Sequence, residues 1–212
     1  MEATSSRIIE VPLYGTDNVL EIDCNELPEQ AQEICDILFQ EKSPPKFYLQ
    51  FALEYFRQNK IDESIVALKK GLSSDVAMNN QAKLPLVNCL ASMYINKAKA
   101  SPIPPAVADQ ADGRPHGTAA NGHGSTATTA NDRDKYFELA YALLDESGRM
   151  DPSHPTTLLC KGLLLLAKRQ FDQAGPLFDR ILGQNSNDVA ALLGKASILA
   201  RAVVVALTPT SP

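Results

Sequence analysis

The fold is decided by residues 155–187, which read PTTLLCKGLLLLAKRQFDQAGPLFDRILGQNSN. Apolar residues recur here at the spacing of two short helices, which we expect to join at about residues 169–171. Large and small side chains stand where two such helices must meet, at Leu158, Gly162, Leu165, Ala174 and Phe178. Two helices this short cannot bury their apolar faces alone, so the stretch predicts a hairpin that stacks on copies of itself.

Copies of this pattern recur along the chain. All five positions return at Tyr48, Ala52, Tyr55, Ser64 and Leu68, and parts of the pattern return at Val87, Ala91, Tyr94, Ala140, Leu144, Leu192, Ala196 and Leu199. The shift from Leu158 to Leu192 is the thirty-four-residue period of the tetratricopeptide repeat. The sequence therefore predicts an all-α solenoid of antiparallel helix pairs. An ordinary helical bundle with accidental spacing is the alternative.

The N-terminal segment, residues 1–28, does not follow the helical spacing. Two β-rich runs, 8–13 and 19–24, flank a Gly-Thr-Asp-Asn turn and predict a short β-hairpin. A lone hairpin is marginal in water. We therefore expect it to lie against the first helices or against a strand of a partner.

Residues 29–99 carry a first helix and the first repeats. A helix is expected over 29–40, a complete hairpin over 46–72, and the first helix of the next hairpin over 84–99. Residues 100–131 are rich in Pro, Gly, Ala, Ser and Thr and hold few large apolar residues. Such a composition cannot offset its own ordering entropy, so it predicts a disordered insertion in the turn of that hairpin.

The remaining repeats are expected over residues 132–201, starting with the delayed second helix at 134–147. Residues 188–201 begin a fourth repeat, but residues 202–212 do not continue with the pattern of a second helix. We interpret these last residues as the divergent tail of a truncated product or an alternative C-terminus. The apolar run at 202–207 would be an association hazard if it were exposed.

Composition argues against several classes of function. The net charge is −5, and the only adjacent basic pairs are Lys69-Lys70 and Lys168-Arg169, so no direct nucleic-acid surface is expected. No run of eighteen apolar residues predicts a membrane span, and the first residues lack a secretory signal pattern. The four cysteines form no Cys-x-x-Cys pair, which indicates reduced thiols in a cytosolic or nuclear protein.

Catalytic chemistry is not indicated. Acids such as Asp145 and Glu146 are typical of a solvated helix face, and no Ser/His/Asp arrangement or glycine-rich phosphate loop is found. His116 and His123 lie in the insertion without a third ligand nearby. We expect no catalytic residue, cofactor, metal or small-molecule substrate. A hydrolase or transferase would need a polar pocket with perturbed acids.

The candidate site is instead a groove lined by the first helix of each hairpin. On the pattern of the tetratricopeptide family, its apolar residues are Leu49, Leu53, Phe56, Ile95, Leu159, Leu163, Leu166 and Leu193, with the polar Asn88 and Ser92 between them. Such a groove favours a partner segment laid along it. The alternative is that these leucines pack on the next helix or on the N-terminal hairpin.

Repeats of this family that hold chaperone C-terminal carboxylates carry Lys and Asn where this chain has Leu49 and Leu53. The chain departs from that pattern, which weighs against a co-chaperone. An unrelated tetratricopeptide adaptor or co-chaperone nevertheless remains the alternative function.

Four longer motifs carry a resemblance to a specific family. They are IIEVPL at 8–13, ALEYFRQNKI at 52–61, KGLLLLAK at 161–168 and NDVAALLGKAS at 187–197. Over roughly residues 7–199 the chain resembles the N-terminal part of the tetratricopeptide-repeat scaffold subunit of the RNA polymerase II-associated factor (Paf) complex, most closely its plant form. The resemblance departs in the 100–131 insertion and after Leu199.

The resemblance implies a nuclear, non-enzymatic scaffold that accompanies RNA polymerase II during transcription elongation. It would hold other Paf-complex subunits together and support co-transcriptional histone modification. The resemblance also implies that the N-terminal repeats contact the Paf subunit itself, which agrees with an apolar groove.

Overall fold

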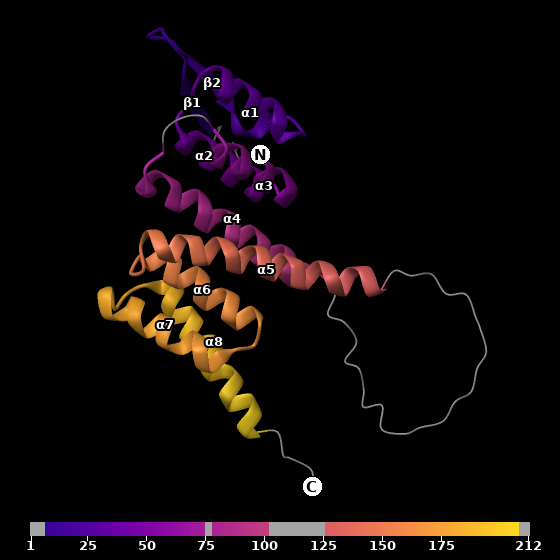
Figure 1. Ribbon diagram of the computed structural model, residues 1–212, viewed down its shortest axis with the longest axis vertical. Helices are drawn as coiled ribbons and strands as arrows, with labels where there is room; N and C mark the ends of the chain where they lie inside the picture. The colour runs from indigo at the N-terminus through magenta and orange to yellow at the C-terminus, as the bar shows by residue number, and fades with distance from the viewer. Residues whose placement is uncertain (1–6, 75–77, 102–125, 208–212) are drawn as a thin grey trace, which may run out of the picture.

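The computed structural model describes residues 7–74, 78–101 and 126–207. Within these ranges the helices follow one another as stacked layers from the N-terminal to the C-terminal side, below a small antiparallel sheet (Figure 1). The strands and α-helices are β1 (Ile8–Pro12), β2 (Val19–Asp23), α1 (Ala31–Gln40), α2 (Pro45–Arg57), α3 (Ile61–Leu72), α4 (Asn80–Ala100), α5 (Thr126–Met150), α6 (Pro155–Ala167), α7 (Phe171–Gln184) and α8 (Val189–Leu207). This arrangement confirms the predicted helical repeat fold.

Three helix pairs form the repeats: α2 with α3, α4 with α5, and α6 with α7. The two helices of each pair contact each other more extensively than they contact any other helix. The recurring large–small–large residues explain this contact because they are buried in α2 and α4: Tyr48, Ala52, Tyr55, Val87, Ala91 and Tyr94. Side chains spaced at one turn share a helix face, so each set forms a continuous packing surface.

The turns of the first and third hairpins are built alike. Asn59 and Arg169 both adopt left-handed backbone conformations, with φ of 62° and 61°. The N–H groups that follow donate back to the last helical turn, Lys60 to Tyr55 O at 2.9 Å and Gln170 to Leu165 O at 2.8 Å. This is the Schellman geometry that satisfies helix C-terminal carbonyls. The equivalent turns fix the same antiparallel return in both repeats.

The N-terminal hairpin lies against the first helices, which was one of the two predicted placements. Strand β1 pairs with β2 in the register Ile8↔Asp23 to Pro12↔Val19, and Val11 is buried in the main core. Gln58 Nε2 donates to Cys24 O at 2.7 Å, and Tyr55 Oη donates to Pro28 O at 3.1 Å. These bonds attach the segment after the hairpin to α2.

Two helix boundaries differ from those expected. Helix α5 begins at Thr126, so residues 126–131 are helical rather than part of an irregular insertion, and α8 continues to Leu207 instead of ending before a divergent tail at 202. Extending an existing helix adds one hydrogen bond per residue fixed, so helical structure continues into segments with weak helical patterns. The rest of the predicted insertion, 102–125 with His116 and His123, and residues 208–212 lie outside the described residues.

The start of α4 also differs from the expected residue 84. Helix α4 begins at Asn80, where the Asn79 side chain caps it by accepting the Ala82 N–H at 2.8 Å. No helix among residues 7–74, 78–101 and 126–207 combines the length and apolar character needed to cross a bilayer.

Candidate functional site

Two adjoining hollows lie along the first helices of the hairpins. The first has a volume of about 400 Å³ and lies between α2 and α4, next to the start of α6. Its lining comprises Leu49, Leu53, Phe56, Pro85, Asn88, Cys89, Ser92, Met93, Asn96, His154 and Thr156. Three of the predicted apolar groove residues and both predicted polar ones, Asn88 and Ser92, therefore meet at one hollow.

The second hollow has a volume of about 360 Å³ and lies between α4 and α6. Its lining comprises Ser92, Ile95, Asn96, Lys99, Leu163, Leu166, Ala167, Phe171 and Ser197. Ser92 and Asn96 line both hollows, so the two spaces adjoin on α4. We call the pair of hollows the α2–α6 groove.

The structure brings together six of the eight predicted groove residues. Leu53 and Phe56 are each 37% exposed and Leu163 is 40% exposed, whereas Ile95 is buried in the main core beneath the second hollow. Removing apolar surface from water is favourable by about 25 cal/mol for each Å². A partner that covers these exposed side chains would therefore gain free energy of binding.

Two predicted groove residues, Leu159 and Leu193, line neither hollow. Leu159 is half-buried and packs against a second core cluster, made of Leu158, Ala174, Phe178, Ile181 and Ala191. Leu193 lies on α8 with 62% of its surface exposed. Leu159 therefore packs within the solenoid, which was the alternative expected for the groove leucines.

A buried polar network lies where α4, α5 and α6 meet. The Asn88 side chain donates to Thr157 Oγ1 at 3.0 Å and accepts from Ser147 Oγ at 2.7 Å, and the Ser147 and Thr157 hydroxyls are 2.7 Å apart. All three residues are buried. Leaving one buried polar group unpaired costs about 1–3 kcal/mol, so the network fixes how α6 sits against α4. It thereby sets the position of one hollow relative to the other.

Several groove residues were missed from the sequence, among them Cys89, Met93 and Asn96. They lie on α4 at three- to four-residue intervals after Pro85, a spacing that identifies one helix face. Burial raises the pKa of Cys89 to about 12, with a smaller contribution from Cys160. The Cys89 thiol is therefore neutral at physiological pH and adds to the apolar lining.

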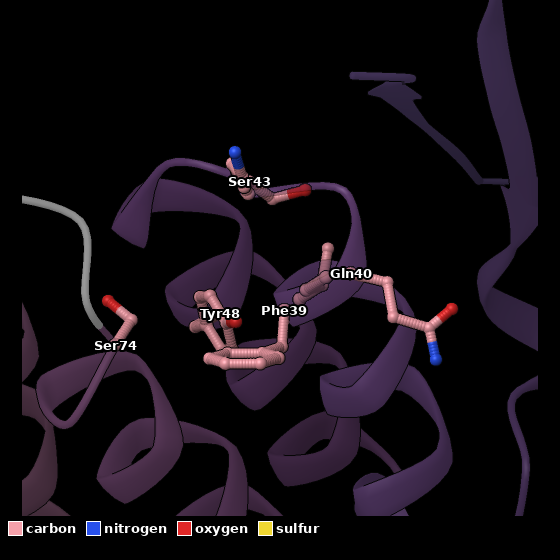
Figure 2. Close-up of a pocket in the computed structure, with 7 residues that line it drawn as sticks. Phe39, Gln40, Ser43, Tyr48 and Ser74 are labelled. Carbon is pink, nitrogen blue, oxygen red and sulfur yellow. The ribbon is translucent and has the colours of Figure 1, made fainter. Parts of the chain in front are cut away.

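A larger cavity, of about 570 Å³, lies away from the groove beside the turn between α1 and α2. Figure 2 shows Ser43 on that turn, Phe39, Gln40 and Tyr48 on the helices below it, and Ser74 after α3. Burial raises the pKa of Tyr48 to about 12, which keeps its phenol neutral. Among the described residues that line this cavity there is no carboxylate.

Over the described parts of the chain, no three His, Cys, Asp or Glu residues come together in a group that could hold a metal ion.

Known proteins resemble this chain in both sequence and fold. No protein-family model matches the chain. It is 27% identical over 206 residues to Tetratricopeptide repeat protein 1 of Schizosaccharomyces pombe and 28% identical over 194 residues to Protein CTR9 homolog of Arabidopsis thaliana. These matches cover 94% and 90% of this chain but only 17% and 15% of the relatives.

A shorter match, 34% identical over 70 residues, relates 32% of the chain to 6% of the RNA polymerase-associated protein CTR9 of Caenorhabditis elegans. The fold is similar to that of the first tetratricopeptide domain of the human RPAP3 protein, with a TM-score of 0.50 and 17% identity over 76% of this chain and 94% of that one. The chain thus has a tetratricopeptide-repeat fold and is similar in sequence to CTR9 homologues.

Proposed function

From a tetratricopeptide fold related to CTR9 homologues, we propose that this chain is a non-enzymatic scaffold that binds a segment of another Paf-complex subunit in the α2–α6 groove. The observation that carries the proposal is an apolar, partly exposed lining contributed by three successive repeats. Repeat proteins bind peptides along extended surfaces of this kind, to which several repeats contribute.

The groove favours a particular kind of segment. Leu49 and Leu53 occupy positions where carboxylate-binding repeats carry Lys and Asn, so an acidic C-terminus finds no matching cation there. Ser92 and Asn96 stand between the two apolar hollows. The best fit is a segment with an apolar side chain for each hollow and a polar group between them.

The wider role follows from the relatives. One of them is named an RNA polymerase-associated protein, and this supports a nuclear protein that accompanies RNA polymerase II. In this role the chain contacts the Paf subunit during transcription elongation and supports histone modification through the complex. We expect no direct binding of nucleic acid, because the chain has a net charge of −5 and its only adjacent basic pairs are Lys69-Lys70 and Lys168-Arg169.

The test is co-expression of the full chain with the Paf subunit, followed by co-purification and a titration of the purified proteins. Leu53→Asp and Leu163→Asp each place a charge in one hollow. We expect each to weaken binding by at least about tenfold, since a buried unpaired charge is costly. Leu139→Asp is the matched control, because Leu139 is 38% exposed on α5 and lines neither hollow.

Circular dichroism of each variant establishes that the repeats remain folded. Unchanged binding by both folded groove variants would mean that the groove is not the binding surface. Strong binding of the wild-type chain to an acidic C-terminal peptide, without binding to the Paf subunit, would favour the co-chaperone alternative.

A further inference from the structure

The N-terminal hairpin leaves one edge of its sheet unpaired. Strand β2 pairs with β1 on one side, and no other strand among the described residues pairs with it on the other side. The hairpin lies at one end of the helix stack (Figure 1). Its inner face packs on the main core through Val11, Leu20 and Ile22, whereas the side chains of Val19 and Glu21 are exposed. The sheet therefore has an unpaired edge at β2 beside an exposed outer face.

The hydrogen-bond pattern identifies the main-chain groups on this edge. At one end of the ladder the Cys24 N–H donates to Arg7 O at 2.8 Å. At the other end the Leu13 N–H donates to Asn18 O at 3.0 Å. Hydrogen-bonded pairs alternate with non-hydrogen-bonded pairs along two antiparallel strands, so the N–H and C=O groups of Glu21 point away from β1. An added strand would bond to these groups.

The two edges of the sheet are not equivalent. Pro12 of β1 lies opposite Val19 and has no N–H, so it interrupts the row of donors on the outer edge of β1. Strand β2, with the sequence VLEID, contains no proline. Proline on an edge strand is one of the means by which natural sheets avoid pairing with other chains. The edge of β2 is therefore the better suited of the two to accept a strand.

Two acidic side chains lie opposite each other on the outer face. Glu10 of β1 is in register with Glu21 of β2, at a non-hydrogen-bonded position where opposed side chains lie close together. Both are exposed, and the ion pairs found among the described residues involve neither of them. Like charges directly opposite each other destabilise a strand pair. A cation placed beside Glu21 would therefore relieve this repulsion.

We propose that the edge of β2 binds an extended, basic segment of a partner protein, which adds a third antiparallel strand with Lys or Arg opposite Glu21. Main-chain hydrogen bonds hold the added strand, and the opposed acids select its charge. A second copy of this chain is a poor occupant, because its own β2 brings two further carboxylates, Glu21 and Asp23, to the same face. The surface is separate from the α2–α6 groove, whose lining includes no residue of the hairpin.

A synthetic peptide of alternating lysine and valine tests this on the purified 212-residue chain. In an extended peptide all the lysines share one face, and a lysine opposite Glu21 exchanges both main-chain hydrogen bonds with it. We expect the peptide to shift the NMR amide signals of Val19 and Glu21 and to slow hydrogen exchange of the Glu21 N–H. The same peptide with N-methylated lysine amides keeps its charge but lacks the donors that face β2. It should bind at least about tenfold more weakly, as should a peptide of glutamate and valine.

Glu21→Lys reverses the charge without opposing the hairpin, because it places a cation opposite Glu10. It should weaken binding of the lysine peptide at least about tenfold and strengthen binding of the glutamate peptide. Glu138→Lys, at an exposed position of α5, is the matched control and should leave both affinities unchanged.

Three results would each overturn the proposal. They are equal binding of the methylated and unmethylated peptides, a charge preference that Glu21→Lys leaves unchanged, and no binding to the wild-type chain at up to about 1 mM lysine peptide. All of them are independent of the groove, because no Paf subunit is present in the measurement.

Discussion

Helices α6 and α8 carry the same large–small–large pattern and differ in what covers it. In α6 the pattern is packed against α7, whereas in α8 its leucines are 46% and 62% exposed. The spacing of the residues therefore identifies the face that a helix uses for packing. Whether that face is buried depends on a neighbouring helix, which the pattern on a single helix does not reveal.

The largest effect expected from this comparison is at Phe178. This buried residue of α7 lies against both Gly162 of α6 and Gly194 of α8, so it is shared by two helix contacts. Phe178→Ala should lower the free energy of unfolding by about 3–5 kcal/mol through lost burial and a cavity. Leu199→Ala, at a residue of α8 that is 62% exposed, should change it by no more than about 0.5 kcal/mol.

Urea unfolding followed by circular dichroism measures both values. If the two substitutions destabilised the chain equally, the Leu199 side chain would have to be packed in solution and not exposed.

The next effect concerns the small residue at the centre of the pattern. In Gly162→Ala the added Cβ would lie 2.7 Å from two atoms of the Phe178 ring, which must then move. We expect a loss of about 1–3 kcal/mol in the free energy of unfolding from overpacking. Gly183→Ala in α7 is the control, because its added Cβ would meet no atom within 4 Å.

The control should be neutral or stabilising, since alanine is the better helix former. A stabilising Gly162→Ala would show that α6 and α7 are less closely packed than the structure indicates.

A third prediction compares two asparagines of α4. Both line the groove, but Asn88 is buried and bonded to Ser147 and Thr157, whereas Asn96 is only half-buried. Asn88→Ala should cost about 1–3 kcal/mol, because it removes hydrogen bonds from buried hydroxyls. It should also weaken binding of a partner that spans both hollows, because α6 loses its fixed position against α4.

Asn96→Ala should have little effect on stability. Equal stability losses at the two positions would argue that the network does not hold the second and third repeats together.

The sequence predicted the parts of the fold that depend on periodic packing. Tyr48, Ala52 and Tyr55 were placed correctly on a packing face, because residues one turn apart must share a face, and all three are buried. Residues 126–131 and 202–207 were not predicted as helix, because their own side chains give a weak signal and the preceding or following helix extends through them.

The site was predicted in part for similar reasons. Helical spacing placed Leu53 and Leu163 on the open side of their helices, and both line the groove. Asn88, which was expected in the groove, lines the first hollow, but the same spacing did not predict that its side chain joins a buried network, because its partners Ser147 and Thr157 come from other helices. Contacts between repeats depend on how the hairpins stack, and single-helix patterns do not contain that information.

The smallest effect is expected at the ion pair between Lys195 of α8 and Asp179 of α7. The two side chains are 36% and 58% exposed, so water and salt screen their attraction. Lys195→Met, which keeps the aliphatic stem, should lower the free energy of unfolding by about 0.2–1 kcal/mol, and the difference should shrink as salt is added. A double-mutant cycle with Asp179→Asn isolates the pair itself. A coupling energy above about 2 kcal/mol, or one independent of salt, would mean that α8 is held to the solenoid by this pair more than by its packing around Phe178.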